Sequence, residues 1–130
     1  MGRMSGFDDA TVLVVEDDEA LRDMLGVALA RAGLRVLAAA SAAGAVAAAD
    51  GARVDLLVTD VVLPDRNGLE LAAALRVEHP ALRVIYLSSW YDDSDFPDLR
   101  GASLLAKPFS LEALRRAVTV ALGSEAPDRT

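Results

Sequence analysis

The sequence contains no cysteine among its 130 residues. It therefore cannot form a disulfide, use a thiolate nucleophile or hold zinc through cysteine ligands. Aromatic residues make up only 5% of the chain, so we expect a core of aliphatic side chains. Basic residues are outnumbered, 13 against 20 acidic ones, which leaves a net charge of −7. An acidic surface repels the phosphates of DNA and of anionic membranes, which argues against direct binding to either.

Long hydrophobic runs are also lacking. The apolar stretches are interrupted by Asp, Arg or Gly, so no transmembrane segment is predicted. Residues 1–10 lack the apolar core of a signal peptide, and together with the absence of cysteine this favours a cytoplasmic protein. The length suits one compact domain, which we place at 11–123, with a flexible lead-in at 1–10 and a flexible tail at 124–130.

What the sequence does contain is a regular alternation of two kinds of segment. Short β-branched or apolar segments predict five strands, at 11–15, 35–38, 54–59, 83–87 and 103–106. Several of them are continuously apolar, which is typical of strands buried on both faces of a parallel sheet. Helical segments separate them, so the alternation predicts an α/β fold with a doubly wound, five-stranded parallel sheet between two layers of helices.

The predicted helices are defined by apolar faces and caps. The first helix has an apolar face of Leu21, Leu25, Ala28 and Ala32 and ends before Gly33. The second is predicted at 41–50 with Ser41 as its N-cap, and the third at 67–78, beginning at Asn67. The last lies between Ser110 and Gly123 and has an apolar face of Leu111, Leu114, Val118 and Leu122. The segment 90–100 holds four aspartates and Pro97. It predicts at most a short, irregular fourth helix.

Polar residues follow the ends of four predicted strands. The first strand runs into Glu16 and Asp17, the third into Asp60, the fourth into Ser88 and the fifth into Lys107. Ligands of doubly wound sheets bind beyond the carboxyl ends of the strands, so these residues are expected to converge. Asp60 closes an apolar strand in which a charge has little structural reason to lie.

Such a group has the chemistry of phosphoryl transfer. Clustered carboxylates cannot all stay ionised without a cation, and ligand sets of oxygen alone favour Mg²⁺ over zinc or copper. Mg²⁺ readily shares its coordination shell with a phosphate, while a lysine and a hydroxyl could bind the other phosphoryl oxygens. A carboxylate would then be the nucleophile.

Each residue also has a structural explanation when it is taken alone. Asp18 could be only a helix N-cap, and the acidic run 16–19 only a solvated helix start. Asp60 could cap the turn that follows it, and Lys107 could be a surface lysine. Their expected convergence on one edge of the sheet favours a functional site over four separate structural roles.

Several motifs, in their order and spacing, resemble the receiver domains of two-component signalling, the fold of chemotaxis response regulators. They are VLVVEDDE at 12–19, DLLVTDVVLP at 55–64, NGLE at 67–70, VIYLS at 84–88 and LAKPF at 105–109. The resemblance extends over roughly 11–122. It implies the strand order 2-1-3-4-5 and a phosphoacceptor domain in a His–Asp phosphorelay, not a turnover enzyme.

The resemblance also implies a role for each site residue. Asp60 is the phosphorylated aspartate; Asp17, Asp60 and the backbone carbonyl of Val62 bind Mg²⁺ directly, and Glu16 binds it through water. Ser88 hydrogen-bonds a phosphoryl oxygen and Lys107 pairs with the phosphoryl group. The peptide bond between Lys107 and the following proline is implied to be cis.

The expected donor is a histidine kinase or a histidine phosphotransfer protein. The expected downstream protein partner binds the surface of the fourth and fifth strand–helix units, and the chain is expected to be a monomer or weak dimer. Leu104 stands where the family often has Tyr or Phe, so the resemblance does not extend to an aromatic switch at this position. The short segment after Ser88 is similar to that of receivers appended to hybrid sensor kinases, so the chain could be either a stand-alone regulator or a module of a hybrid kinase. In either case we expect no DNA-binding output domain.

Val62 and the pair Trp90 and Tyr91 are expected to flank the phosphoryl group and to slow its hydrolysis. Three other classes of protein fit the sequence less well. An aspartyl phosphatase usually has a second aspartate two positions after the nucleophile, where this chain has Val62. A flavodoxin-like cofactor binder needs a phosphate loop where the acidic run 16–19 would repel phosphate. A receiver that no longer accepts phosphate would lack some of the site residues.

Overall fold

The computed structural model describes residues 9–89 and 103–123. The elements in chain order are β1 (Thr11–Val15), α1 (Glu19–Arg31), β2 (Arg35–Ala39), α2 (Ala42–Ala49), β3 (Leu56–Asp60), α3 (Gly68–Arg76), β4 (Arg83–Ser88), β5 (Ser103–Ala106) and α4 (Leu111–Gly123). The predicted irregular fourth helix and most of the two predicted flexible ends lie outside the described residues.

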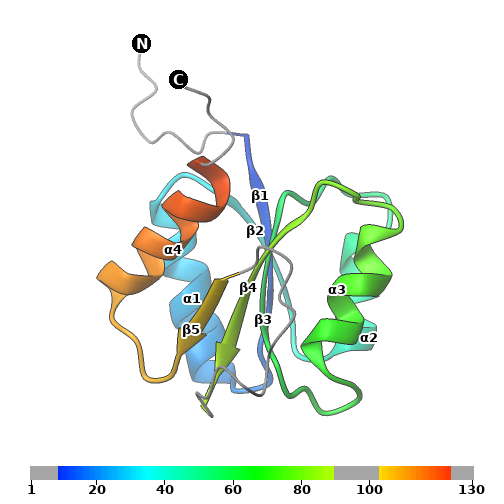
Figure 1. Ribbon diagram of the computed structural model, residues 1–130, viewed down its shortest axis with the longest axis horizontal. Coiled ribbons are helices and arrows are strands. Elements are labelled where there is room, and N and C mark those ends of the chain that lie inside the picture. Colours follow the sequence, from blue (N-terminus) through cyan, green and yellow to red (C-terminus); the bar gives the residue numbers. More distant parts are fainter. Residues whose placement is uncertain (1–8, 90–102, 124–130) are drawn as a thin grey trace.

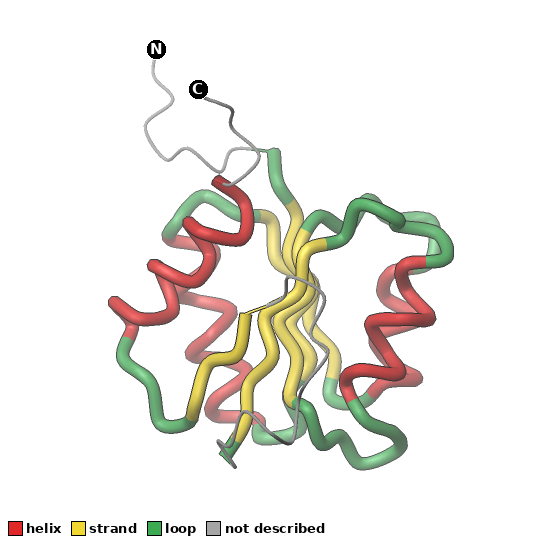
Figure 2. The backbone as a smooth tube through the Cα atoms, viewed as in Figure 1, coloured by secondary structure: helices red, strands yellow, loops and turns green. Residues whose placement is uncertain are grey.

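The five strands form one parallel sheet in the order β2-β1-β3-β4-β5, which confirms the predicted fold. Helices α1 and α4 cover one face of the sheet, and α2 and α3 cover the other (Figure 1). Figure 2 shows the strands side by side between the two helical layers. The two layers remove the apolar residues of both sheet faces from water, as a parallel sheet requires.

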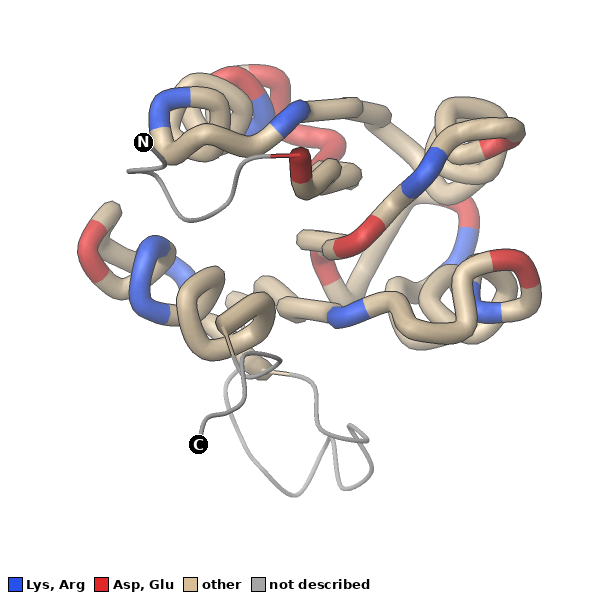
Figure 3. Tube along the Cα trace, turned by 90° about the horizontal axis from the view of Figure 1, so that it is seen from above, with Lys and Arg blue, Asp and Glu red and all other residues tan. Residues whose placement is uncertain are grey.

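The core consists of two apolar clusters, one on each face of the sheet. Successive strand residues point to opposite faces, so Leu13 of β1 contributes to the cluster that includes Leu71 of α3, while Val12 contributes to the cluster that includes Leu25 of α1. Charged positions of both signs lie on the outer helices and the loops (Figure 3). Among the described residues, no helix has the length and hydropathy needed to cross a membrane.

Helix starts are fixed by side-chain caps. Asp18 accepts a hydrogen bond from the Leu21 N–H, and Ser41 accepts one from the Gly44 N–H. Asn67 forms a capping box with Glu70 at the start of α3. These caps satisfy backbone donors that lack partners within the helix, and they confirm the predicted starts of α2 and α3.

Some boundaries differ from the predicted ones for local reasons. Strand β3 begins at Leu56, two residues later than predicted, because the Asp55 carboxylate accepts the Thr11 N–H at 2.8 Å, a bond that a strand carbonyl would otherwise make. Helix α3 ends at Arg76, because the N–H groups of the next two residues bond three positions back, in a tighter turn. Helix α4 includes Gly123, which was predicted to follow it.

Candidate functional site

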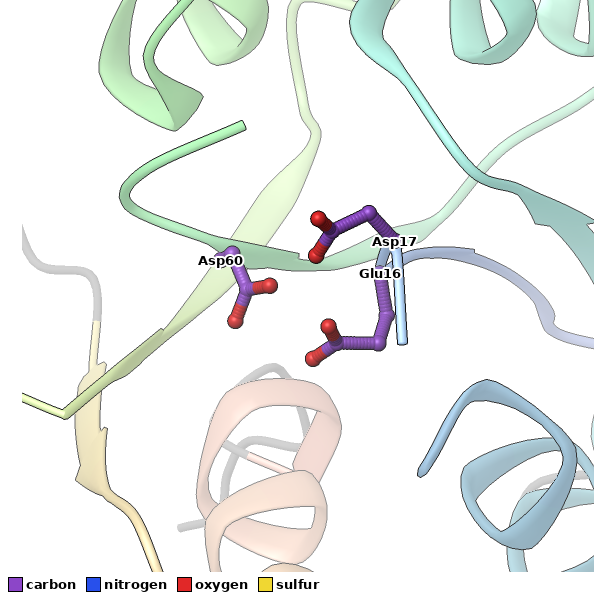
Figure 4. A group of neighbouring side chains, drawn as sticks. All are labelled: Glu16, Asp17 and Asp60. Atoms are coloured by element: carbon purple, nitrogen blue, oxygen red, sulfur yellow. The ribbon is translucent and has the colours of Figure 1, made fainter. Parts of the chain in front are cut away.

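The carboxyl ends of β1 and β3 bring three acidic side chains together. The two strands are parallel neighbours, so Glu16 and Asp17, which follow β1, lie beside Asp60, the last residue of β3. Carboxylate oxygens of all three residues lie within 4.8 Å of one another. Figure 4 shows these side chains gathered at the ends of the two strands.

Glu16 is almost wholly buried, with 1% of its surface exposed. Its N–H donates to the Ala39 carbonyl at 3.1 Å, and its own carbonyl accepts from Nη1 of Arg22 at 2.9 Å. Its carboxylate oxygen Oε2 accepts the Asp18 N–H at 3.0 Å. The neighbouring strand and helix α1 therefore hold both the backbone and the side chain of Glu16 in place.

Lys107 supplies a positive charge to the cluster from the end of β5. Its Nζ lies 2.7 Å from Oδ1 of Asp60 and 2.9 Å from Oε1 of Glu16, so one ammonium group bridges two carboxylates. The Lys107 N–H donates to the Ser88 carbonyl at 2.8 Å, which ties the residue to the end of β4. The Lys107–Pro108 peptide bond is cis, as the resemblance implies.

The pKa values of the two buried carboxyl groups, Asp60 and Glu16, shift in opposite directions. Burial raises the pKa of Asp60 to about 7, and the adjacent Glu16 adds to the rise, while Lys107 opposes it. Burial also pushes the pKa of Glu16 up, but its hydrogen bonds with Asp60, the Asp18 N–H and Lys107 bring it below its ordinary value. Asp60 is therefore the more readily protonated of the two groups, and a cation bound beside it would favour its charged form.

The pKa of Lys107 is raised. Burial pushes that pKa down, but the bonds from the ammonium group to Asp60 and Glu16 outweigh burial and hold it above its ordinary value. Lys107 is therefore a permanent cation at neutral pH. It offsets only part of the negative charge of the three carboxylates.

A cavity of about 320 Å³ opens beside this cluster. Its lining residues are Asp17, Asp60, Val61, Val62, Leu87, Ser88, Ser89 and Lys107. Asp60 is 5% exposed on its inner wall, whereas Val62 is 72% exposed. The structure thus places five of the six predicted site residues around one cavity, with the sixth, Glu16, within ion-pair distance of Lys107 beneath it.

Gly68, at the start of α3, lets the helix approach the end of β3 closely. Its N–H donates to the Val61 carbonyl at 2.6 Å. A Cβ at this position would collide with the backbone carbonyl oxygen of Asp60. Sequence reasoning did not single out this requirement, although the glycine after the cap residue Asn67 was a visible signal.

Two further residues near the site were missed. Arg22 was not distinguished from other helix-surface residues, although it holds the Glu16 carbonyl. Asp65 was not singled out in the sequence, yet its carboxylate accepts the N–H groups of Ala42 and Ala43, 23 and 22 positions away in the chain. Contacts at such separations leave no local pattern in a sequence.

The donor set of the acidic cluster fits a hard divalent cation. It offers carboxylate oxygens and no nitrogen or sulfur ligand, and Asp17 is exposed at its open side. Such a set suits Mg²⁺, which prefers oxygen ligands and retains several waters. A larger groove of about 550 Å³ between α1 and α4 is lined by apolar residues such as Met24, Val27 and Leu111 and lies away from this cluster.

Comparison with known proteins agrees with this geometry. Residues 12–119 match the model of the response regulator receiver domain family. The chain is 39% identical over 109 residues to the probable transcriptional regulatory protein TcrX of Mycobacterium tuberculosis, covering 78% of this chain and 45% of that protein. It is 40% identical over 115 residues to the sensor kinase CckA of Brucella abortus, covering 84% of this chain and 12% of that kinase.

Among solved structures, the chemotaxis response regulator CheY4 of Vibrio cholerae superposes with a TM-score of 0.81 at 30% identity, covering 87% of this chain and 98% of that one. The response regulator TrrA of Thermotoga maritima, at 24% identity and a TM-score of 0.76, shares the fold; the shared region covers 87% of this chain and 99% of that one. The chain spans less than half the length of TcrX and about an eighth of CckA. From the family match over residues 12–119 and the shared fold, we conclude that the chain belongs to the response regulator receiver domain family.

Proposed function

We propose that this receiver domain accepts a phosphoryl group on Asp60, with Mg²⁺, from a histidine kinase or a histidine phosphotransfer protein. The observation that carries the proposal is the position of Asp60, which lies at the end of a buried strand, in contact with Lys107 and in a cluster with Glu16 and Asp17. A carboxylate with this burial and these neighbours has little structural purpose of its own.

In the proposed site, Asp17, Asp60 and the backbone carbonyl of Val62 would hold Mg²⁺, with Glu16 contributing through a water molecule. The bound ion supplies neutralisation of the charge that carboxylates and a phosphoryl group would otherwise bring together. TrrA of Thermotoga maritima was solved in complex with Mg²⁺ and a beryllium fluoride. We propose Mg²⁺ binding for this chain too, because its cluster of Glu16, Asp17 and Asp60 offers only oxygen ligands.

The proposed reaction is a single displacement at phosphorus. A carboxylate oxygen of Asp60 attacks the phosphorus of the donor phosphohistidine, a new P–O bond forms, and the P–N bond breaks with its electron pair returning to the imidazole. Lys107 and the Ser88 hydroxyl bind phosphoryl oxygens in the cavity that they line with Asp60. The chain accepts one phosphoryl group and does not turn over a substrate, and Val62, in place of a second aspartate, separates it from aspartyl phosphatases.

Readout would follow from the charge gained at Asp60. The aspartyl phosphate would carry about two negative charges in place of the single charge of the ionised carboxylate, which would shift Ser88 and Lys107 and bias the surface formed by β4, β5 and the following helix. Leu104 packs beside the core cluster that contains Tyr86, its partner in the β4–β5 register, so an aliphatic residue occupies the place of the family's aromatic switch. The partner would bind this surface, in the cytoplasm, whether the domain acts alone or as a module of a hybrid kinase.

The test is transfer from a protein donor. Full-length chain is mixed with a phosphorylated histidine kinase core and Mg²⁺, and label on the chain is followed for the wild type, Asp60→Asn and Asp50→Asn. Asp50 is an exposed aspartate at the end of α2, so its variant controls for the loss of one charge. Loss of labelling in Asp60→Asn alone is expected; full labelling of Asp60→Asn would reject the proposal.

A further inference from the structure

We propose that Asp65 is a positioning residue for the metal site, because it fastens the loop that follows Asp60 to the start of helix α2. The proposal rests on the proposed function only in that Mg²⁺ is the ion to be positioned. Asp65 itself lies outside the cavity and touches neither carboxylate of the buried pair. Its effect would be transmitted through the backbone.

The contact is a two-oxygen bridge between distant segments. Oδ1 of Asp65 accepts the Ala42 N–H and Oδ2 accepts the Ala43 N–H, each at 2.9 Å. Helix α2 has no acidic residue in its first turn, so Asp65 supplies the negative charge that a helix N-terminus favours. These backbone bonds lower the pKa of Asp65, which keeps the carboxylate charged.

The loop that carries Asp65 is closed by its own backbone contacts. Between Asp60 and α3 it is closed by the Leu63 N–H donating to the Arg66 carbonyl at 3.2 Å and by a bridge between Val62 and Asn67. The Gly68 N–H bonds the Val61 carbonyl at its base. A tether at Asp65 is therefore expected to fix the whole loop, including the Val62 carbonyl that is proposed as a ligand.

The tether also completes a chain of contacts around the site. The Ala39 carbonyl at the end of β2 accepts the Glu16 N–H at 3.1 Å, and β2 leads through Ser41 into α2. Asp65 joins α2 to the loop after β3. Contacts thus link the segment after β1 to the segment after β2, and that segment to the loop after β3. The proposed metal ligands come from the first and the third of these segments.

The chain offers a matched control for this role. Ser41 caps the same helix through its Oγ, which accepts the Gly44 N–H at 3.0 Å, but this bond stays within α2 and its own cap. Ser41→Ala removes a cap of α2 without releasing the loop, whereas Asp65→Ala removes a cap of α2 and releases the loop. The two variants separate helix stability from loop position.

The experiment measures the Mg²⁺ affinity of the full chain by titration calorimetry, at a temperature where circular dichroism shows each variant folded. We expect Asp65→Ala to weaken Mg²⁺ binding by about tenfold, the lower end of the range for residues that orient metal ligands. Ser41→Ala should change the affinity by less than about twofold, although it lowers stability. Asp65→Asn retains one accepting oxygen and should lie between; it carries the test if Asp65→Ala does not fold.

Unchanged affinity in both Asp65 variants would overturn the proposal, as would equal losses in Asp65→Ala and Ser41→Ala. The outcome is separable from that of the proposed function. If the wild type binds Mg²⁺ but accepts no phosphoryl group, the phosphoacceptor proposal fails while the affinity comparison still decides the role of Asp65. If the wild type binds no Mg²⁺, both proposals fail.

Discussion

Lys107 forms an ion pair with Asp60, with 2.7 Å between Nζ and Oδ1, and the same ammonium group reaches Glu16. The lysine therefore occupies carboxylate oxygens that Mg²⁺ would use, and the two cations compete for them. We predict that Lys107→Met tightens Mg²⁺ binding about fivefold, equivalent to roughly 1 kcal/mol for a partly exposed pair, and slows phosphoryl acceptance. Titration calorimetry measures the first effect and labelling by a small acyl phosphate the second.

A surface variant controls for the change in net charge. Arg116 pairs with Glu112 on the exposed side of α4, and Arg116→Met removes the same single charge from the chain. If both variants tighten Mg²⁺ binding equally, the effect comes from net charge and the predicted competition at Asp60 is absent.

Gly68 is predicted to be a site where alanine is not tolerated. Its Cβ would collide with the carbonyl oxygen of Asp60 and lie 3.1 Å from Cγ2 of Thr59, both on a rigid strand. We expect Gly68→Ala to lower the free energy of unfolding by about 1–3 kcal/mol. Urea denaturation measures the change.

Gly26, in the interior of α1, is the matched control, because a Cβ added there would meet only the Val36 side chain, at 3.9 Å. Gly26→Ala is expected to raise the free energy of unfolding by about 0.5–1 kcal/mol, since glycine is a poor helix former. Loss of stability of similar size in both variants would contradict the close approach of α3 to Asp60.

Asp65 is predicted to give acid-dependent stability. Its hydrogen bonds from Ala42 and Ala43 lower its pKa in the folded chain below the ordinary value of 3.8. A lowered pKa of an acid stabilises the fold above the ordinary value, and that stabilisation is lost as the pH falls through the folded pKa. The difference in free energy of unfolding between wild type and Asp65→Asn should therefore shrink from about pH 6 to about pH 3. Parallel pH profiles of the two proteins would contradict it.

Val62 is predicted to protect the phosphoryl group from water. It lines the cavity beside Asp60 and offers no polar group to orient a hydrolytic water. We expect Val62→Asn to speed loss of phosphate by roughly tenfold, which corresponds to about 1.4 kcal/mol of activation free energy. The decay of the phosphorylated chain after removal of the donor measures this rate. The sequence implied a similar role for Trp90, which lies outside the described residues.

Val77 provides the control for this substitution. It is equally apolar and highly exposed, but it lies at the end of α3 and does not line the cavity. Val77→Asn should leave the decay rate unchanged. An unchanged decay rate in Val62→Asn would contradict the prediction that Val62 shields the phosphoryl group from water.

The order of the elements was predictable from the sequence because it depends on local patterns. The apolar segments that became β1 and β5 have the predicted bounds, since each is limited by residues that break the strand pattern. The start of β3 was predicted too early, because the competing bond from the Thr11 N–H to the Asp55 carboxylate joins residues 44 positions apart. Element identity is local information, whereas the start of β3 depends on a contact between distant segments.

The candidate site, too, was predictable in part from the sequence. That the strand-end residues Glu16, Asp17 and Asp60 would converge was predictable from topology alone, because parallel strands end at one edge of the sheet. The bridge from Lys107 to Glu16, across 91 positions, and the tether from Asp65 to α2 were not predicted. Both depend on side-chain conformations that only the folded structure determines.

The central claim is that Asp60 accepts the phosphoryl group in a magnesium site. The most direct test is mass spectrometry of the intact chain and its peptides after incubation with a small acyl phosphate, with and without Mg²⁺. The account predicts one phosphoryl group per chain, located at the end of β3 on Asp60, that forms only with the metal present. A phosphoryl group on another residue, or labelling that persists without a divalent cation, would contradict it.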